Sequence, residues 1–391
     1  MISIPRGWTY EPLTKFIDSR SGNGKLIKGK QSLEFIKGFF PAYSASGQDI
    51  WTEKAEFFGE GVVVSAVGAR CGKAFLAEGS WTAVANTHVL QIKKGAELDI
   101  RFLWYLCNDE KWWIRSGTAQ PFVKVKDTLE RLQLVPPLAE QHKIVELLED
   151  HLSRLDAALA DVKQAKLKAA QFKVAFLRNV FSGDASWNSI PMKQLGKWGG
   201  GGTPSKANEK FWTDGTVPWL SPKDMGPLEI TQTVDKITEE ACLNSTVKKI
   251  PENSVVFVVR SGILERKLPI ALTKVETTLN QDMKALTFSD KVNPKFGFYS
   301  MLGLEQDILR TCRKSGTTVA SINTESLMNY EIKIPSLPVQ AEILDYVDSQ
   351  LTLIDNSVSQ VESVLKVGNS LRRSLLQAAF TGQLTKEVVS V

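Results

Sequence analysis

Two stretches of this 391-residue chain match each other and decide its fold: VPPLAEQHKIVELLEDHLSRLDAAL, residues 135–159, and IPSLPVQAEILDYVDSQLTLIDNSV, residues 334–358. The second lies 199 residues after the first, and Gln141 therefore aligns with Gln340. The alignment continues without a gap for about fifty positions. Chance rarely gives so long a register, so we predict a tandem repeat.

The same offset aligns shorter motifs on either side of these stretches. The sequence SGT at 116–118 aligns with SGT at 315–317, and FSG at 181–183 aligns with FTG at 380–382. The duplicated segment is therefore longer than the helical stretch alone, and its two ends match as well as its middle.

The repeated stretches have the pattern of long helices. Their apolar residues recur at steps of four and three, which is the a/d seam of a coiled coil. The predicted seam positions are Leu148, Leu152, Leu155, Leu159, Val162, Val347, Leu351, Ile354, Val358, Val361 and Leu365. Prolines before each stretch and Gly183 or Gly382 after it are start and stop signals. Each helix should span about 43 residues, or roughly 65 Å. Neither can bury its seam alone, so we expect the two to pack as an antiparallel coiled coil.

The segments between the helices have the pattern of strands. FFGEGVVVSAVGARCGKAFLA, residues 57–77, and IPENSVVFVVRSGILERKLPIAL, residues 250–272, each combine turn residues with a β-branched run. A second strand-like run follows each of them, at 81–93 and 275–288. Glycine, proline and asparagine punctuate both segments. These features predict two diverged copies of one mixed, strand-rich α+β domain.

The predicted order is globular domain, helix, globular domain, helix. The boundaries are residues 1–135, 136–184, 185–334 and 335–391. The fold class is therefore α+β, with two strand-rich domains separated by two long helices in a pseudo-two-fold repeat. Within the second domain, Gly199–Gly202 with Thr203 and Pro204 is predicted to form a flexible loop.

The positive charge of the chain lies in the two globular segments. The net charge is +4 over residues 1–135 and +3 over 186–334, but zero over 140–184 and −2 over 335–391. An excess of this size permits nucleic-acid binding without requiring it. No charge-free apolar run of about 18 residues occurs and no signal peptide is recognisable, so we expect a cytoplasmic protein without a membrane span.

The motifs of common catalytic and metal sites are missing. Lys25 and Lys73 each follow a glycine but precede Leu and Ala, so neither completes a phosphate-binding Walker loop. The sequence has no H-E-x-x-H motif and no G-x-S-x-G motif. His142 and His151 fall on the first predicted helix, where a solvated position is the simpler interpretation. The four cysteines, Cys71, Cys107, Cys242 and Cys312, form no C-x-x-C pair. We therefore expect neither catalysis nor a metal site.

Three stretches resemble the specificity subunits of type I restriction–modification systems. They are SGTAQPFVKVKDTLERLQLVPPLAEQHKIVELLE from Ser116, SGTTVASINTESLMNYEIKIPSLPVQAEILDYVD from Ser315, and GGTPSKANEKFWTDGTVPWLSPKDM from Gly201. The resemblance covers essentially the whole chain in the family's order. The sequence departs from the family's pattern around residues 8–24, and Val339 replaces the commoner acidic residue before Gln340.

The resemblance implies a DNA-reading subunit without catalytic activity. Each globular segment would be a target-recognition domain that reads one half of a bipartite double-stranded DNA target. The helices would hold the domains apart and dock two methyltransferase subunits, and restriction subunits would join through the complex. No cofactor is expected in this chain; S-adenosylmethionine, ATP and Mg²⁺ would be bound by the partners.

Polar and basic residues outside the helices are the candidates for DNA contact, because base edges and phosphates need donors and acceptors. They are Arg70, Lys73, Asn86, His88, Arg115, Gln120 and Lys124 in the first domain, and Lys206, Lys223, Arg260, Ser261, Asn280, Gln281 and Lys314 in the second. For any one of them, a solvated loop position is the simpler interpretation. Trp112, Trp113, Trp212 and Trp219 are expected to be core or loop anchors rather than base-stacking platforms.

Two other functions compete with DNA recognition. A coiled-coil adaptor that binds only proteins would suit the nearly neutral helices, and the basic domains do not decide against it. A DNA-modifying enzyme fits less well because the catalytic motifs are missing. Salt-dependent binding of random duplex separates the adaptor from the DNA reader, and methyl transfer by the purified chain alone would identify the enzyme.

Overall fold

The computed structural model describes residues 4–315 and 319–386, and Gly316 and Thr317 of the second SGT motif lie outside these ranges. The chain divides into two compact units. One comprises Met1–Val162 with Ser363–Val391, and the other comprises Lys163–Glu362. The first unit contains globular domain 1, residues 4–135, and the second contains globular domain 2, residues 185–334. Each unit also holds part of both long helices.

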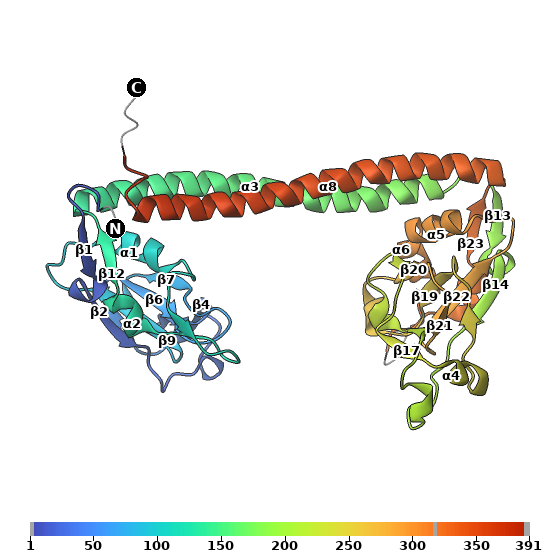
Figure 1. Cartoon of the computed structure of the whole chain (residues 1–391), viewed down its shortest axis with the longest axis horizontal. Coiled ribbons are helices and arrows are strands. Elements are labelled where there is room, and N and C mark those ends of the chain that lie inside the picture. The colour runs from blue at the N-terminus through green and yellow to red at the C-terminus, as the bar shows by residue number, and fades with distance from the viewer. Residues whose placement is uncertain (1–3, 316–318, 387–391) are drawn as a thin grey trace. The chain divides into compact units, whose positions relative to one another are not determined.

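The two predicted helices are present, and each runs for 44 residues: α3 is Leu138–Phe181 and α8 is Leu337–Phe380. In the first unit the start of α3 lies beside the end of α8, and in the second the end of α3 lies beside the start of α8 (Figure 1). Antiparallel pairing is thus confirmed within each unit. A glycine with positive φ follows each helix, Gly183 at 78° and Gly382 at 71°, as expected for a helix stop.

Apolar contacts along the seam hold the helices together, and ion pairs flank them. All eleven predicted seam residues are buried or partly buried. Exposed ion pairs flank the seam in the second unit, such as the one between Lys166 Nζ and Glu362 Oε1 at 2.6 Å. In the first unit a Cβ on Gly368 would lie 2.5 Å from Leu159 Cδ2. The Leu159 side chain therefore packs directly on the backbone of α8 at Gly368, and a larger residue there would require Leu159 to move.

Domain 1 combines two small sheets with two short helices. One sheet has the order β2-β9-β6-β7 and the other β4-β3-β8-β5, with β3 and β8 parallel. The strands of the two sheets are β2 Ile17–Ser21, β3 Phe40–Ser44, β4 Gly47–Thr52, β5 Phe57–Phe58, β6 Gly61–Ser65, β7 Ala74–Ala77, β8 Ser80–Ala83 and β9 Thr87–Ile92. The helices are α1 Ile100–Cys107 and α2 Val125–Glu130. A hairpin of β10 Arg115–Ser116 and β11 Phe122–Val123 lies between these helices in the sequence.

Domain 2 repeats this topology with one additional strand, β16, at the edge of its first sheet. Its sheets have the orders β14-β22-β19-β20-β16 and β17-β15-β21-β18, and β15 and β21 are parallel, as β3 and β8 are. The strands are β14 Gly196–Gly200, β15 Val217–Leu220, β16 Glu229–Ile230, β17 Asp235–Ile237, β18 Lys249–Ile250, β19 Val255–Val258, β20 Ile270–Thr273, β21 Thr277–Leu279 and β22 Met283–Phe288; the helices are α4 Glu239–Asn244, α5 Pro294–Gly303, α6 Glu305–Cys312 and α7 Thr324–Asn329. Duplication of the globular domain is confirmed.

Each domain is closed where its chain enters and leaves. In domain 1, β1 (Thr9–Pro12) pairs antiparallel with β12 (Leu132–Val135). In domain 2, β13 (Asn188–Pro191) pairs antiparallel with β23 (Glu331–Ile334). Entry and exit therefore lie side by side at the base of each domain, next to the start of the long helix that follows.

The end of each long helix packs against the globular domain of its own unit. Phe380, at the end of α8, contacts Phe102 of α1 with ring centroids 5.3 Å apart and an interplanar angle of 71°. Phe181, at the end of α3, contacts Phe296 of α5 at 5.2 Å and 72°. The two contacts are equivalent by the repeat. Each domain thus packs on the start of the helix that follows it and on the end of the other.

A buried glutamine ties each domain to its helix. Gln340 Nε2 donates to the carbonyls of Pro335 and Lys291 at 2.9 and 3.0 Å, and its Oε1 accepts from the backbone N–H of Asn293 at 2.8 Å. Gln141 makes the same three contacts in domain 1, at 2.8, 3.2 and 2.7 Å. Both side chains are fully buried. A buried amide satisfied on both ends fixes the angle at which the helix leaves the domain.

Replacing Gln340 with methionine is expected to destabilise the second unit by at least about 2 kcal/mol. The substitution keeps the volume but leaves one backbone N–H and two carbonyls without their partner, and each such buried group costs about 1–3 kcal/mol. Urea-induced unfolding measures the loss. Gln360→Met is the matched control on the exposed surface of α8 and should stay within about 0.5 kcal/mol of the parent chain. Equal midpoints for the two variants would refute this assignment.

The prediction of a loop over Gly199–Gly202 is wrong in its first half. Gly199 and Gly200 lie in β14, which pairs with β22. The backbone bends only at Gly201, where a Cβ would lie 1.8 Å from the carbonyl oxygen of Asn280. The glycines therefore allow close backbone packing rather than flexibility.

Candidate nucleic-acid interface

Three loops of domain 1 meet in what we term loop cluster 1: residues 66–73 between β6 and β7, 84–87 before β9, and 116–122 of the β10–β11 hairpin. Val67 and Phe122 form an antiparallel bridge. Gly68 N donates to the carbonyl of Pro121 at 2.8 Å, and Ala66 N donates to the carbonyl of Asn86 at 2.9 Å. These backbone bonds fix the loops relative to one another.

The corresponding loops of domain 2 form loop cluster 2: residues 259–262, 280–282, 313–315 and 319–321. Arg260 and Ser321 form the equivalent bridge. Ser261 N donates to the carbonyl of Ala320 at 3.0 Å, and Val259 N donates to that of Asp282 at 2.8 Å. The repeat therefore extends to the loops that carry most of the candidate residues.

Five of the seven candidates in domain 1 have exposed side chains and lie on loop cluster 1 or within two residues of its hairpin loop. They are Arg70, Asn86, Arg115, Gln120 and Lys124. Lys73, the last residue of the 66–73 loop, is half-buried, and its Nζ lies 5.4 Å from the centroid of the Phe75 ring. His88 lies in β9, and its buried Nε2 has no hydrogen-bond partner among the described residues. Burial also lowers the pKa of His88, so its imidazole is predominantly neutral at pH 7.

Five of the seven candidates in domain 2 lie on loop cluster 2: Arg260, Ser261, Asn280, Gln281 and Lys314. Asn280 is only 6% exposed, and its Oδ1 accepts from Asp282 N at 3.0 Å, which stabilises the turn. Lys206 and Lys223 come from the loops after β14 and β15 and lie outside this set of hydrogen bonds. Lys223 Nζ pairs with Asp235 at 2.6 Å, which raises the pKa of the lysine.

Carboxylates balance several basic side chains of the two clusters. Arg260 Nε lies 2.6 Å from Asp282 Oδ1, and Arg115 lies 3.2 Å from Glu110. Both arginines face solvent, where an ion pair contributes little to stability and is easily exchanged. A phosphate can therefore replace the carboxylate at either arginine with little cost to the fold.

The four tryptophans serve as anchors, as predicted. Trp113 and Trp219 are buried, and their indole N–H groups donate to the carbonyls of Cys107 and Gly202. Trp112 and Trp212 are half-buried and lie edge-on against these two rings. The two buried indoles, Trp113 and Trp219, are therefore not available for base stacking.

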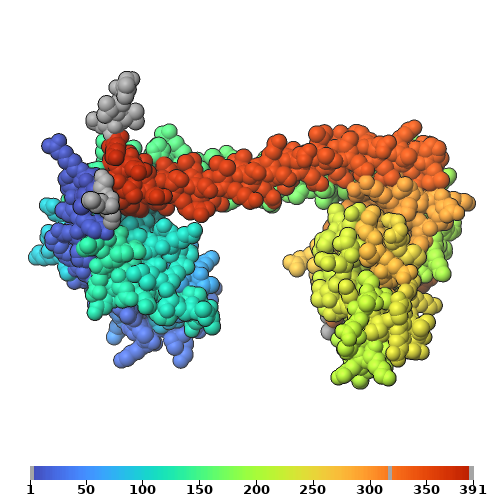
Figure 2. Space-filling model, in the orientation of Figure 1, coloured from blue at the N-terminus to red at the C-terminus, as the bar shows by residue number. Residues whose placement is uncertain are grey.

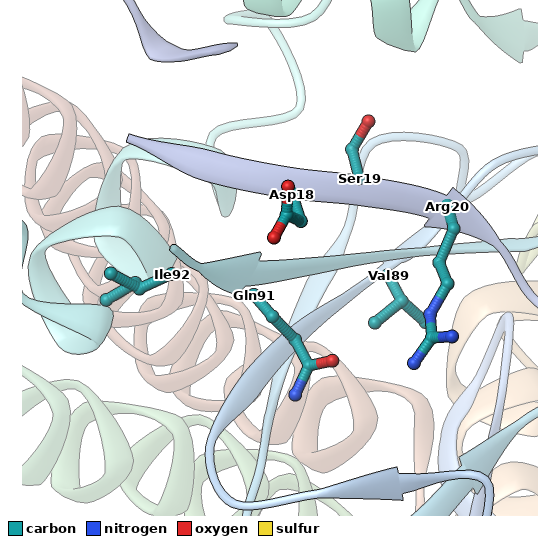
Figure 3. A pocket seen from close by; sticks show the side chains of 6 residues that line it. All are labelled: Asp18, Ser19, Arg20, Val89, Gln91 and Ile92. Carbon is teal, nitrogen blue, oxygen red and sulfur yellow. The ribbon is translucent and has the colours of Figure 1, made fainter. Parts of the chain in front are cut away.

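A shallow hollow of about 410 Å³ lies on domain 1 along strands β2 and β9. It is lined by Asp18, Ser19, Arg20, Val89, Gln91 and Ile92 (Figure 3). Arg20 stacks over Phe57 at 4.1 Å, and Gln91 Nε2 donates to the carbonyl of Phe58 at 3.2 Å. Both polar groups are thus engaged in holding β5 against the sheet, which is a structural role.

Three features of the described residues bear on chemistry. Across the described part of the chain, His, Cys, Asp and Glu side chains do not gather in groups of three that could hold a metal ion. The four cysteines are free thiols. Within residues 4–315 and 319–386, no helix combines the length and apolarity that a bilayer crossing requires.

Two features of the structure could not be predicted from the sequence pattern. One is residues 24–39 of domain 1, an irregular segment with four lysines whose role only its position reveals. The other is Glu140, which accepts from Trp8 Nε1 at 2.9 Å and from Thr385 Oγ1 at 2.6 Å. That carboxylate joins both ends of the chain to α3. An acidic residue in the first turn of a helix gave no hint of either partner.

The chain is thus a protein in which two copies of one α+β domain alternate with two long helices. Comparison with known proteins identifies the family. A profile described as "Type I restriction modification DNA specificity domain" matches residues 5–168 and 185–363, and the chain belongs to that family. The two matched segments correspond to the two copies of the repeat.

Curated relatives agree with this assignment. The chain is 41% identical over 224 residues to the EcoR124I/EcoR124II specificity subunit of Escherichia coli, covering 57% of this chain and 54% of the relative. It is 27% identical over 191 residues to the MjaIX specificity subunit of Methanocaldococcus jannaschii, covering 47% and 42%. The chain thus spans about half the length of the curated relatives it matches.

Solved structures share the fold over nearly the whole chain. A chain from a structure concerned with complex assembly and conformational transition of the type I R-M system superposes with a TM-score of 0.76 at 17% identity, covering 97% of this chain and 99% of that one. The HsdS subunit from Thermoanaerobacter tengcongensis gives 0.57 at 18% identity, covering 97% and 98%. At these identities the likeness supports the fold alone.

Proposed function

We propose that this chain is a DNA-recognition subunit that reads a bipartite target without catalysing a reaction. Residues 1–135 and 185–334 are the two target-recognition domains, and each reads one half-site. Residues 136–184 and 335–391 are the spacer helices. The observation that carries this proposal is the equivalence of loop clusters 1 and 2. Each presents exposed arginine and amide side chains on loops that backbone hydrogen bonds hold in place, which suits readout of base edges and phosphates.

Membership in the family supports the choice of partners. Two methyltransferase subunits dock on the helices, and restriction subunits join through the complex. S-adenosylmethionine, ATP and Mg²⁺ belong to those partners and not to this chain. We place the assembly in the cytoplasm, where it meets the cell's DNA. The seam residues keep the helices paired, and the exposed sides of α3 and α8 remain for the partners.

A coiled-coil adaptor without DNA binding is the alternative. The exposed apolar residues on the helices, such as Phe172 and Leu353, favour protein docking there. They do not oppose DNA binding by the domains, since they lie on α3 and α8 and not on the loop clusters. The concentration of positive charge in the globular domains favours the DNA reader.

Salt-dependent duplex binding is the expected result for the purified chain. Gel shifts with random duplex between about 50 and 200 mM salt should show affinity falling with a slope of about −0.9 per phosphate neutralised. The double variant Arg70→Gln/Lys124→Gln should flatten that slope by about two units if each side chain contacts a phosphate. Lys143→Gln, exposed on α3, is the control and should not change it. Binding that is independent of salt would favour the adaptor.

A further inference from the structure

Residues 24–39 of domain 1 connect β2 and β3, and we call this segment the wedge loop. It exposes four large apolar side chains. Leu33 is 69% exposed and Phe35 is 67% exposed, and Ile27 and Ile36 are also open to solvent. Four lysines accompany them in the same segment, at 25, 28, 30 and 37. Apolar side chains surrounded by lysines suit a partner with an anionic surface and an apolar interior.

The wedge loop is held in place. Leu26 packs against a small core of Ala42, Ile50 and Val84. The backbone N–H of Trp51 donates to the carbonyl of Ser32 at 2.9 Å. One edge of Phe35 rests on the Trp51 ring, with centroids 4.9 Å apart. The exposed rings and methyl groups are therefore presented by an anchored loop and do not result from local disorder.

The wedge loop adjoins loop cluster 1. Asn23 N donates to the carbonyl of Ala83 at 2.8 Å, and Ala85 N donates to the carbonyl of Leu26 at 3.0 Å. The start of the wedge loop thus lies against the residues that precede Asn86. In Figures 1 and 2 the dark-blue N-terminal segment of domain 1 lies beside the helices, and other blue loops lie at the end of that domain remote from them. A duplex held by loop cluster 1 would be within reach of the wedge loop.

The equivalent segment of domain 2 is built differently. Residues 203–216 between β14 and β15 carry two aromatic side chains, and both turn inward. Phe211 is buried, and Trp212 packs edge-on against Trp219. The repeat has thus kept a loop at this position in both domains, but in this loop only domain 1 presents large apolar side chains outward.

We propose that the wedge loop inserts Phe35, supported by Leu33, into the base stack of duplex DNA at the half-site read by domain 1, while its lysines neutralise the flanking phosphates. This inference rests on the proposed function and adds an asymmetry to it. Apolar side chains that enter a base step unstack it and bend the duplex, and the energy of insertion depends on the step. Domain 1 therefore reads deformability at its half-site in addition to base edges, and domain 2 does not.

The test uses the full chain and duplexes that carry its target, mapped by sequencing methylated bases in cells that express the complex. 2-Aminopurine replaces one base at successive positions of each half-site. Binding of the parent chain should raise fluorescence at one step of the domain 1 half-site and at none in the other. Phe35→Ala/Leu33→Ala should abolish that signal and weaken binding about tenfold, since a stacked aromatic contributes on that order.

Two controls separate this inference from misfolding and from the proposed function. Phe58→Ala removes an equally exposed aromatic outside the loop and should change neither signal nor affinity. Lys25→Gln/Lys30→Gln should lower the salt slope and leave the fluorescence change intact. A parent chain that binds no duplex would overturn the proposed function itself. Duplex binding by the parent chain without a fluorescence change would refute insertion by the wedge loop and leave DNA recognition in place. The same conclusion would follow if Phe35→Ala/Leu33→Ala kept its affinity for the duplex and lost only the binding of a partner protein.

Discussion

Leu351→Asp is expected to unfold the second unit under conditions where the parent chain is stable. Leu351 is 7% exposed and belongs to the core that joins α3, α8 and domain 2, where Leu177 and Phe296 also lie. An aspartate there must either bury a charge or take up a proton, and the leucine's contacts are lost in both cases. The expected cost is about 4 kcal/mol or more, a large share of a domain's stability.

The matched control for this substitution lies two residues away. Leu353 sits on the same helix and is 59% exposed, so Leu353→Asp should shift the melting temperature by only a few degrees. Leu152→Asp should destabilise the first unit in the same way as Leu351→Asp does the second. Calorimetry on the three variants reads out the difference. Similar melting of Leu351→Asp and Leu353→Asp would show that the paired helices contribute no core.

Exchange of residues 186–334 for the same segment of another family member is expected to change one half of the DNA target completely and leave the other half as it was. The segment is continuous, and its ends are paired as β13 and β23, so the joints fall at neighbouring positions. Since specific sites are bound about 10³–10⁷ times more tightly than others, the new half-site should replace the old one outright.

The structure also specifies what an exchanged domain must retain. Phe296 receives Phe181 from the end of α3, and the backbone N–H of Asn293 receives Gln340. A donor domain needs an aromatic residue at the first position and a residue other than proline at the second, because Gln340 accepts from its backbone N–H. Mapping methylated bases in cells that express the chimera with its methyltransferase gives the result. A change in both half-sites would contradict modular reading, and the reciprocal exchange of residues 9–135 should alter the opposite half.

The helices and the repeat could be predicted because their signals are local and occur twice. Prolines and glycines marked the helix ends to within a few residues: α3 and α8 end at Phe181 and Phe380, two residues before the predicted stops. The strand runs could also be predicted, although residues 81–93 and 275–288 each contain two strands. In the first run the break falls at Asn86, which adopts a φ of 65°. An asparagine tolerates that left-handed conformation better than most residues.

The candidate site was harder to predict because non-local contacts assemble it. The bridge between Val67 and Phe122 joins residues far apart in sequence. The periodicity of apolar residues does not predict such a pairing. The half-buried position of His88 and the buried position of Asn280 follow from neighbours that no single stretch of sequence reveals. From the sequence, Gln141 and Gln340 could be recognised only as aligned residues of the repeat. Their structural role follows from the backbone groups to which they are hydrogen-bonded.

The discontinuous first unit constrains the order in which the chain matures on the ribosome. That unit needs both Met1–Val162 and Ser363–Val391, whereas the second unit is the uninterrupted stretch Lys163–Glu362. At about 5–20 residues per second, translation of the 200 intervening residues takes roughly 10–40 s. During that interval Phe102 lacks the partner that Phe380 later supplies. The domain made first is therefore the last to be finished, and a chain whose synthesis stops early is left with an incomplete reader at its N-terminal end.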